Sequence, residues 1–108
     1  MATLKAMLIK AATKALALTE TSGRIAHGGL ERQQLMVANR DTANACWLQL
    51  GGSSVTAVQP VSGGATGGFY LGPQSTIIVT LDVGQTYIAG ICASGLTATI
   101  DVTVVEGF

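Results

Sequence analysis

Apolar and polar side chains alternate over most of the chain after residue 14, in short runs separated by Gly, Asn and Pro. The pattern is clearest near the end of the chain, where Ile100, Val102 and Val104 fall on one side while Asp101 and Thr103 fall on the other. Alternation with a period of two residues is typical of a β-strand with one buried face. The pattern therefore predicts strands rather than helices for this part of the chain.

Turn-forming residues divide the alternating region into seven or eight short strands, at intervals of about ten residues. The predicted strands are residues 14–19, 30–39, 45–50, 55–61, 69–71, 76–81, 86–93 and 98–105. The strand at 55–61 is weakened by Pro60, which belongs at a sheet edge, and Arg24–His27 is assigned to a turn-rich connection. No interval between strands is long enough for a crossover helix. These features are typical of a sandwich or small barrel, and we predict an all-β fold: a small antiparallel β-sandwich of jelly-roll type.

The first thirteen residues break the alternation. Leu4 and Leu8 recur at helical spacing, and the Ala, Leu, Lys and Met residues around them favour helices. A helix this short forms only when it is docked, and an extended arm that orders on a neighbouring subunit fits equally well. We therefore divide the chain into an N-terminal arm or short helix, residues 1–13, and a β-sandwich domain, residues 14–108.

Charged residues are few and unevenly placed. They make up 11% of the chain against a usual share of about 25%, so uncharged polar residues or other subunits must cover much of the surface. All six basic residues lie in the first forty positions. We predict a homo-oligomer whose basic N-terminal segment docks on an acidic partner surface; the alternative is an ordinary solvated edge. The lysines are dispersed and no aromatic residue lies among them, so no nucleic-acid partner is expected.

No residue pattern in the chain predicts catalysis. His27 is the only histidine and lies in a glycine-flanked turn, so we expect it on a surface loop. The carboxylates are scattered, no Gly-x-Ser-x-Gly elbow occurs, and the glycine-rich residues 62–68 lack the lysine of a phosphate-binding loop. We therefore predict that the protein is not an enzyme and that it has no catalytic residue, cofactor or metal ion.

The cysteines and lysines indicate the compartment. Cys46 and Cys92 have no Cys-x-x-Cys spacing, and we expect two buried, reduced thiols, with a single disulfide as the alternative. Lys5, Lys10 and Lys14 interrupt the apolar residues at the start of the chain, which excludes a signal-peptide core and a membrane span. The protein is therefore expected to be made in the cytoplasm and to have no membrane partner.

Aromatic and N-terminal residues supply the candidate binding site. We predict that Trp47 packs in the core. Phe69 and Tyr70 are neighbours on a strand and point to opposite faces, so one of them is exposed or covered by a partner. Phe108 is either a fraying end or an anchor in a neighbouring subunit. The candidate partner-binding residues are Leu4, Lys5, Leu8, Ile9, Lys10, Lys14, Tyr70 and Phe108.

An ordered set of short segments runs from Arg32 to Glu106. The set comprises Val37-Ala38-Asn39, Trp47 followed by Gly51-Gly52, Ser53–Thr56, Leu71 with Pro73 and Ser75, Tyr87-Ile88-Ala89, Ala93-Ser94-Gly95 and a Val-rich strand ending near Glu106. In this order the segments resemble a family of small virion proteins of tailed bacteriophages.

The resemblance implies a structural role in the virion. Our leading hypothesis is a capsid decoration or cement protein on the capsid surface, which forms a homo-oligomer, a trimer at a local three-fold axis, and binds the major capsid protein. One alternative is a tail or head–tail junction component. Another is a carbohydrate- or receptor-binding module, whose site would combine Trp47, Tyr70 and the glycine-rich loop.

Overall fold

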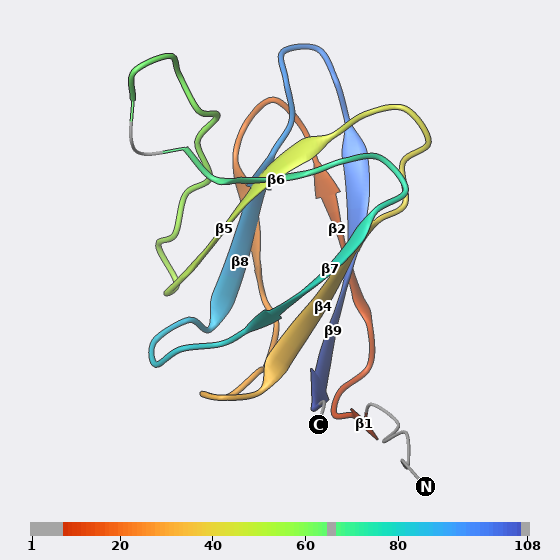
Figure 1. Ribbon diagram of the computed structural model, residues 1–108, viewed down its shortest axis with the longest axis vertical. Coiled ribbons are helices and arrows are strands. Elements are labelled where there is room, and N and C mark those ends of the chain that lie inside the picture. Colours follow the sequence, from red (N-terminus) through yellow and green to blue (C-terminus); the bar gives the residue numbers. More distant parts are fainter. Residues whose placement is uncertain (1–7, 65–66, 107–108) are drawn as a thin grey trace, which may run out of the picture.

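The protein is an all-β sandwich of two antiparallel sheets (Figure 1). A computed structural model describes residues 8–64 and 67–106, which form nine strands and contain no helix. The predicted fold class is therefore confirmed.

The first sheet has five strands. They are β1 (Leu8–Ile9), β2 (Lys14–Leu18), β4 (Gln34–Asn39), β7 (Thr76–Thr80) and β9 (Ala98–Glu106). The strand order is β1-β9-β4-β7, and β2 also pairs with β9. Because β9 pairs with β1 through Val105 and Glu106 and with β2 through residues 98–102, these two short strands follow one another along the same edge of β9.

The second sheet has four strands in the order β3-β8-β5-β6. They are β3 (Gly23–Ala26), β5 (Cys46–Gly51), β6 (Phe69–Leu71) and β8 (Tyr87–Ile91). The strand β3 corrects the sequence analysis, which assigned Arg24–His27 to a turn. All four residues of β3 pair with β8, from Gly23 opposite Gly90 to Ala26 opposite Tyr87. This pairing joins segments over sixty positions apart and overrides the weak local strand pattern.

The core lies between the sheets and is built from alternate residues of the strands. The buried apolar side chains include Leu18, Leu35, Val37, Cys46, Leu48, Leu71, Ile88, Cys92, Ile100, Val102 and Val104. The alternation predicted for Ile100 to Val104 is confirmed, because Ile100, Val102 and Val104 are buried while Asp101 and Thr103 remain partly exposed.

The segment between β5 and β6 is not a strand where the structure describes it, although residues 55–61 were predicted as one. It is held against the second sheet by side-chain hydrogen bonds. Ser22 Oγ accepts from Ala57 N at 2.8 Å, and Gln59 Nε2 donates to Cys92 O at 2.6 Å. The first contact satisfies the Ala57 N–H, which a strand would have paired with a neighbouring strand.

The described part of the predicted arm is extended, not helical. Leu8 and Ile9 form β1, and the Lys10 N–H donates to the Val104 carbonyl at 2.8 Å. The end of the arm thus extends the first sheet along β9. Residues 1–7 lie outside the described residues.

Candidate partner-binding surface

Both cysteines are free, buried thiols. Burial raises the pKa of Cys46 to about 12, with a smaller contribution from Cys92. The pKa of Cys92 is also raised, mainly by burial and then by the Asp41 carboxylate. Because the thiolate is the reactive form, these shifts keep both side chains inert at neutral pH. Within residues 8–64 and 67–106 no group of three or more His, Cys, Asp or Glu side chains could hold a metal ion, and no pocket is present.

His27 is buried, which corrects its predicted place on a surface loop. Its Nδ1 accepts a hydrogen bond from the Gly29 N–H at 2.9 Å, and its backbone N–H donates to the Thr86 carbonyl. Nε2 has no hydrogen-bond partner of normal geometry. Gly29 allows this packing, because a Cβ there would lie 2.4 Å from Leu81 and 3.0 Å from the imidazole.

Burial lowers the pKa of His27 below its ordinary value of 6.5, the Gln85 backbone opposes this shift, and the Lys14 charge adds to it. The unfolded chain therefore takes up the proton first as the pH falls. The contribution of His27 to stability is complete above pH 6.5 and decreases from there towards the lower folded-state pKa.

We expect the free energy of unfolding to fall as the pH decreases below 6.5 towards the lowered folded-state pKa of His27. Urea denaturation at a series of pH values measures this slope, and His27→Gln should remove most of it. Glu20 and Asp41, whose pKa values are lowered by hydrogen bonds from backbone N–H groups, act at lower pH. An unchanged slope in His27→Gln would contradict the assignment.

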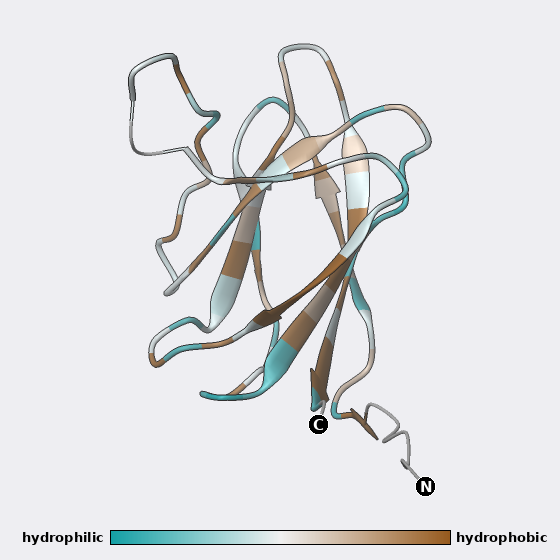
Figure 2. Cartoon of the chain, viewed as in Figure 1, coloured by the Kyte–Doolittle hydropathy of each residue, from teal (hydrophilic) through white to brown (hydrophobic). Residues whose placement is uncertain are grey.

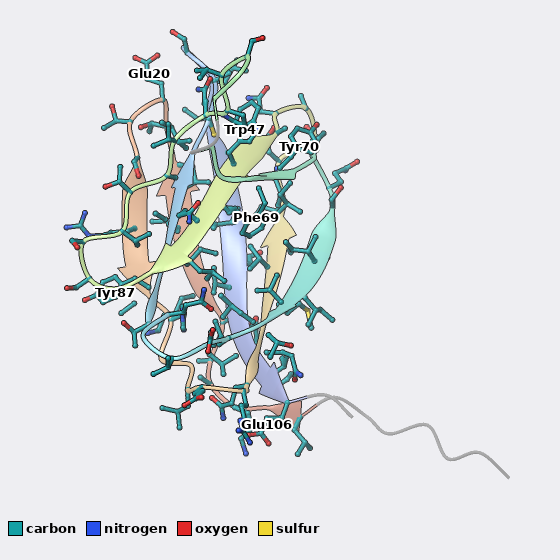
Figure 3. All side chains as sticks on the ribbon, turned by 60° about the vertical axis from the view of Figure 1, so that its left-hand side comes forward. Glu20, Trp47, Phe69, Tyr70, Tyr87 and Glu106 are labelled. Carbon is teal, nitrogen blue, oxygen red and sulfur yellow. The ribbon has the colours of Figure 1, made fainter. Side chains whose placement is uncertain are left out.

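Trp47 lies on the outer face of the second sheet, so its predicted place in the core is wrong. Cys46 and Leu48 on either side of it are fully buried, whereas Trp47 is half-buried and stands opposite Tyr70 on β6. The two rings meet edge to face with centroids 5.9 Å apart (Figure 3). Tyr70 is 61% exposed, while Phe69 packs partly against the core, so the two neighbours point to opposite faces of the strand as expected.

The structure brings only some of the candidate residues together. Leu8, Ile9 and Lys10 are exposed at the end of the sandwich where β1 pairs with the end of β9. Tyr70 lies towards the opposite end from Glu106 (Figure 3). Lys14 donates from Nζ to the Ala26 carbonyl at 3.0 Å, which ties β2 to β3 across the two sheets. Leu4, Lys5 and Phe108 lie outside the described residues.

Four exposed apolar side chains lie at the end that carries β1, and we call them the basal patch: Leu8, Ile9, Leu30 and Val83. Their exposed fractions are 47%, 72%, 68% and 74%. Figure 2 shows the apolar positions at β1 and at the turn between β7 and β8 on this lower end. Exposure of this extent at four sites on one end of the sandwich favours an interaction surface there.

Hydrogen bonds hold the three segments of the basal patch in place. The Leu30 N–H donates to Gln33 Oε1 at 2.9 Å, and Gln33 Nε2 donates to Glu106 Oε1 at 3.0 Å. Glu106 stands opposite Leu8 in the pairing of β1 with β9. The turn that carries Val83 is joined to the same framework, because the Leu81 N–H donates to the Gln33 carbonyl at 2.8 Å. Hydrogen bonds thus connect all three segments that carry the basal patch.

Charged side chains accompany the basal patch. Four exposed charged residues are adjacent to it in the sequence: Lys10 follows Ile9, Glu31 and Arg32 follow Leu30, and Asp82 precedes Val83. An apolar centre with charged neighbours is the usual composition of a protein–protein interface. Leu8, Ile9 and Lys10 were already candidate binding residues from the sequence, whereas Leu30 and Val83 were not. The available signal was a large apolar residue inside each of two turn-rich segments, Gly28-Gly29-Leu30 and Asp82-Val83-Gly84.

Comparison of the chain with protein-family models, curated proteins and solved structures finds no match. The resemblance to phage virion proteins therefore rests on the sequence segments alone. Among the residues that the structure describes, no helix is long and apolar enough to span a membrane.

Proposed function

We propose that the protein is a structural component of a phage virion, a capsid decoration protein that binds the major capsid protein through the basal patch. The observation that carries this proposal is the presence of four exposed apolar side chains at one end of the sandwich. Burying such side chains against a partner is favourable by roughly 1.5–3 kcal/mol for each one that is fully covered.

The N-terminal segment supports the same surface as the binding site. Residues 1–7 precede Leu8 directly, so the chain that carries Leu4 and Lys5 joins the sandwich within the basal patch. An arm and a patch that act together enlarge the contact area. The basic residues Lys5 and Lys10 would add attraction to an acidic shell surface, which is screened by salt.

The fold and composition suit a protein that acts by binding other proteins. A sandwich with 11% charged residues has much uncharged surface for association, and many symmetric copies convert a modest contact into strong retention on a shell. The proposed site of action is the capsid surface, with the protein made in the host cytoplasm.

Copy number in purified virions tests the role. The particles should come from the phage whose genome encodes the chain, and quantitative mass spectrometry should give the copies per particle. On the order of hundreds of copies would support decoration, since a shell repeats its binding site many times. A few copies would instead favour a tail or head–tail component, and absence from the particle would contradict both.

Substitution of the basal patch tests the proposed surface. The double variant Ile9→Glu, Leu30→Glu places charge where apolar contact is proposed, and both sites are too exposed to affect folding strongly. We expect at least a roughly tenfold loss of affinity for shells lacking the protein, measured by co-sedimentation. The matched control is Val61→Glu, Leu96→Glu, which adds the same charge at exposed apolar sites outside the patch. Equal binding by both double variants would contradict the assignment of the surface.

A second function is favoured by a separate observation, the edge-to-face pair of the half-buried Trp47 and the exposed Tyr70 on the outer face of the second sheet. Aromatic faces of this kind stack on sugar rings, as a receptor-binding module would require. Glycan binding by the isolated protein, lost in Tyr70→Ala and kept in the basal-patch variant, would favour this function over decoration.

A further inference from the structure

The strand β7 forms an open edge of the first sheet. It pairs with β4 on one side, and no described strand pairs with its other side (Figure 1). An edge strand presents a row of backbone N–H and C=O groups that can pair with another chain.

The pairing with β4 shows which backbone groups face the open edge. The Asn39 N–H donates to the Ser75 carbonyl at 2.9 Å, and the Leu81 N–H donates to the Gln33 carbonyl at 2.8 Å. In an antiparallel pair, successive residues direct their N–H and C=O groups to opposite sides. The odd-numbered residues therefore bond to β4, while Thr76, Ile78 and Thr80 direct theirs towards the open edge.

The core is also incompletely covered at this edge. Leu35 and Val37 on β4 are fully buried. Their partners on β7, Val79 and Ile77, point into the same core but remain partly exposed. On the outer face, Ile78 is 48% exposed. Another strand alongside β7 would cover apolar surface on both faces of the sheet.

The edge carries none of the usual features that prevent strand addition. Its sequence, Thr-Ile-Ile-Val-Thr, contains no charged residue and no proline, and the chain is uncharged from Thr42 to Leu81. The register with β4 is continuous from Thr76 to Thr80, so no bulge turns the strand aside. Edge strands of monomeric proteins are commonly protected by lysines, prolines or bulges.

We propose that β7 is a self-association surface, on which the β7 strand of a second copy adds antiparallel about a two-fold axis at Ile78. The sequence of the strand is nearly palindromic about this residue. Thr76 would stand opposite Thr80 of the second copy, and Ile77 opposite Val79. Ile78 would face its own counterpart, and the two first sheets would become one continuous sheet.

A second copy fits this edge because each residue meets a suitable partner in the same register. Threonine faces threonine on the outer side, which is a favourable cross-strand pair, and aliphatic residues face one another on the core side. In this register Thr76, Ile78 and Thr80, whose backbone N–H and C=O groups face the open edge, stand opposite the same three residues of the second copy. The two strands can therefore exchange hydrogen bonds symmetrically, as a contact about a two-fold axis requires. The absence of charge on β7 removes like-charge repulsion between copies.

The contact is distinct from the proposed decoration function and uses none of the basal-patch residues. It predicts a two-fold interface, in place of the three-fold arrangement expected from the sequence. A five-residue edge is smaller than a standard interface, so we expect a dissociation constant in the micromolar range, on the order of 10 μM.

Sedimentation of the full chain from about 1 μM to about 500 μM tests the proposal, since this range spans the expected dissociation constant. The wild type should change from monomer to dimer. Ile78→Lys places like charges opposite each other at the two-fold axis and should weaken the dimer at least roughly tenfold. The control Ala17→Lys adds the same charge to the outer face of β2 in the same sheet, where it is exposed, and should dimerise as the wild type does.

A cross-linking variant keeps the test independent of the stability of Ile78→Lys. Two copies of Ile78→Cys would lie at a Cα separation of about 5.5 Å, which permits a disulfide. Mild oxidation should give covalent dimers of Ile78→Cys and none of Ala17→Cys, because the native cysteines are buried. A wild type that stays monomeric throughout the range, a dimer unaffected by Ile78→Lys, or equal cross-linking at both sites would overturn the proposal.

Discussion

Leu48→Ala is expected to lower the free energy of unfolding by about 3 kcal/mol, the usual cost of removing a fully buried leucine from a core. Leu48 lies on the inner face of β5 and has no exposed surface. It packs over Gly90 of β8, where a Cβ would lie 3.0 Å from its Cδ2 and 2.6 Å from Leu18 Cδ1. Because Leu48 is closely packed here, its truncation to alanine leaves a cavity in the core.

The neighbouring variant Trp47→Ala provides the matched comparison. Although it removes a larger side chain, we expect a loss of only about 1 kcal/mol, since the ring lies half-buried on the outer face, where it makes an edge-to-face pair with Tyr70. Urea denaturation of both variants followed by circular dichroism measures the two losses. A greater loss for Trp47→Ala than for Leu48→Ala would contradict the assignment of the faces of β5.

The difference between these two residues shows where sequence reasoning was limited. In β5 large apolar residues occur at both the inward-facing and the outward-facing positions. Trp47, a large apolar residue, was therefore assigned to the core although it points outward. Gln49 shares a face with Trp47 and was the available signal, because a glutamine is rarely buried without a partner. In β9 the same reasoning succeeded, since Asp101 and Thr103 mark the outer face without ambiguity.

The fold class could be predicted because turn residues and alternation are local signals. The basal patch could not, because Leu30 and Val83 become neighbours only when the turn after β7 bonds to the segment before β4. His27 was misplaced for a similar reason. Its burial depends on Leu81, more than fifty positions away, which packs against the space left by Gly29.

Asn39→Leu is expected to lower the free energy of unfolding by about 3 kcal/mol, since it removes three hydrogen bonds from a buried site. Asn39 is buried at the end of β4. Its Nδ2 donates to the Asn44 carbonyl at 2.9 Å and to the Leu71 carbonyl at 3.4 Å. Its Oδ1 accepts from the Asp41 N–H at 3.0 Å. One side chain thus joins β4 to the start of β5 and the end of β6, which belong to the other sheet.

Leucine has the same branched shape as asparagine and is somewhat larger, so this variant removes the hydrogen bonds without creating a cavity. The control Asn44→Leu removes a bond from an exposed site, where Nδ2 donates to the Thr97 carbonyl, and should cost no more than about 1 kcal/mol because water can replace the side chain. Hydrogen exchange of the Asp41 amide gives a local measurement, since the amide loses its acceptor in Asn39→Leu and should exchange faster. Equal losses of stability in the two variants, with Asp41 exchange unchanged, would show that the buried amide does not hold the two sheets together.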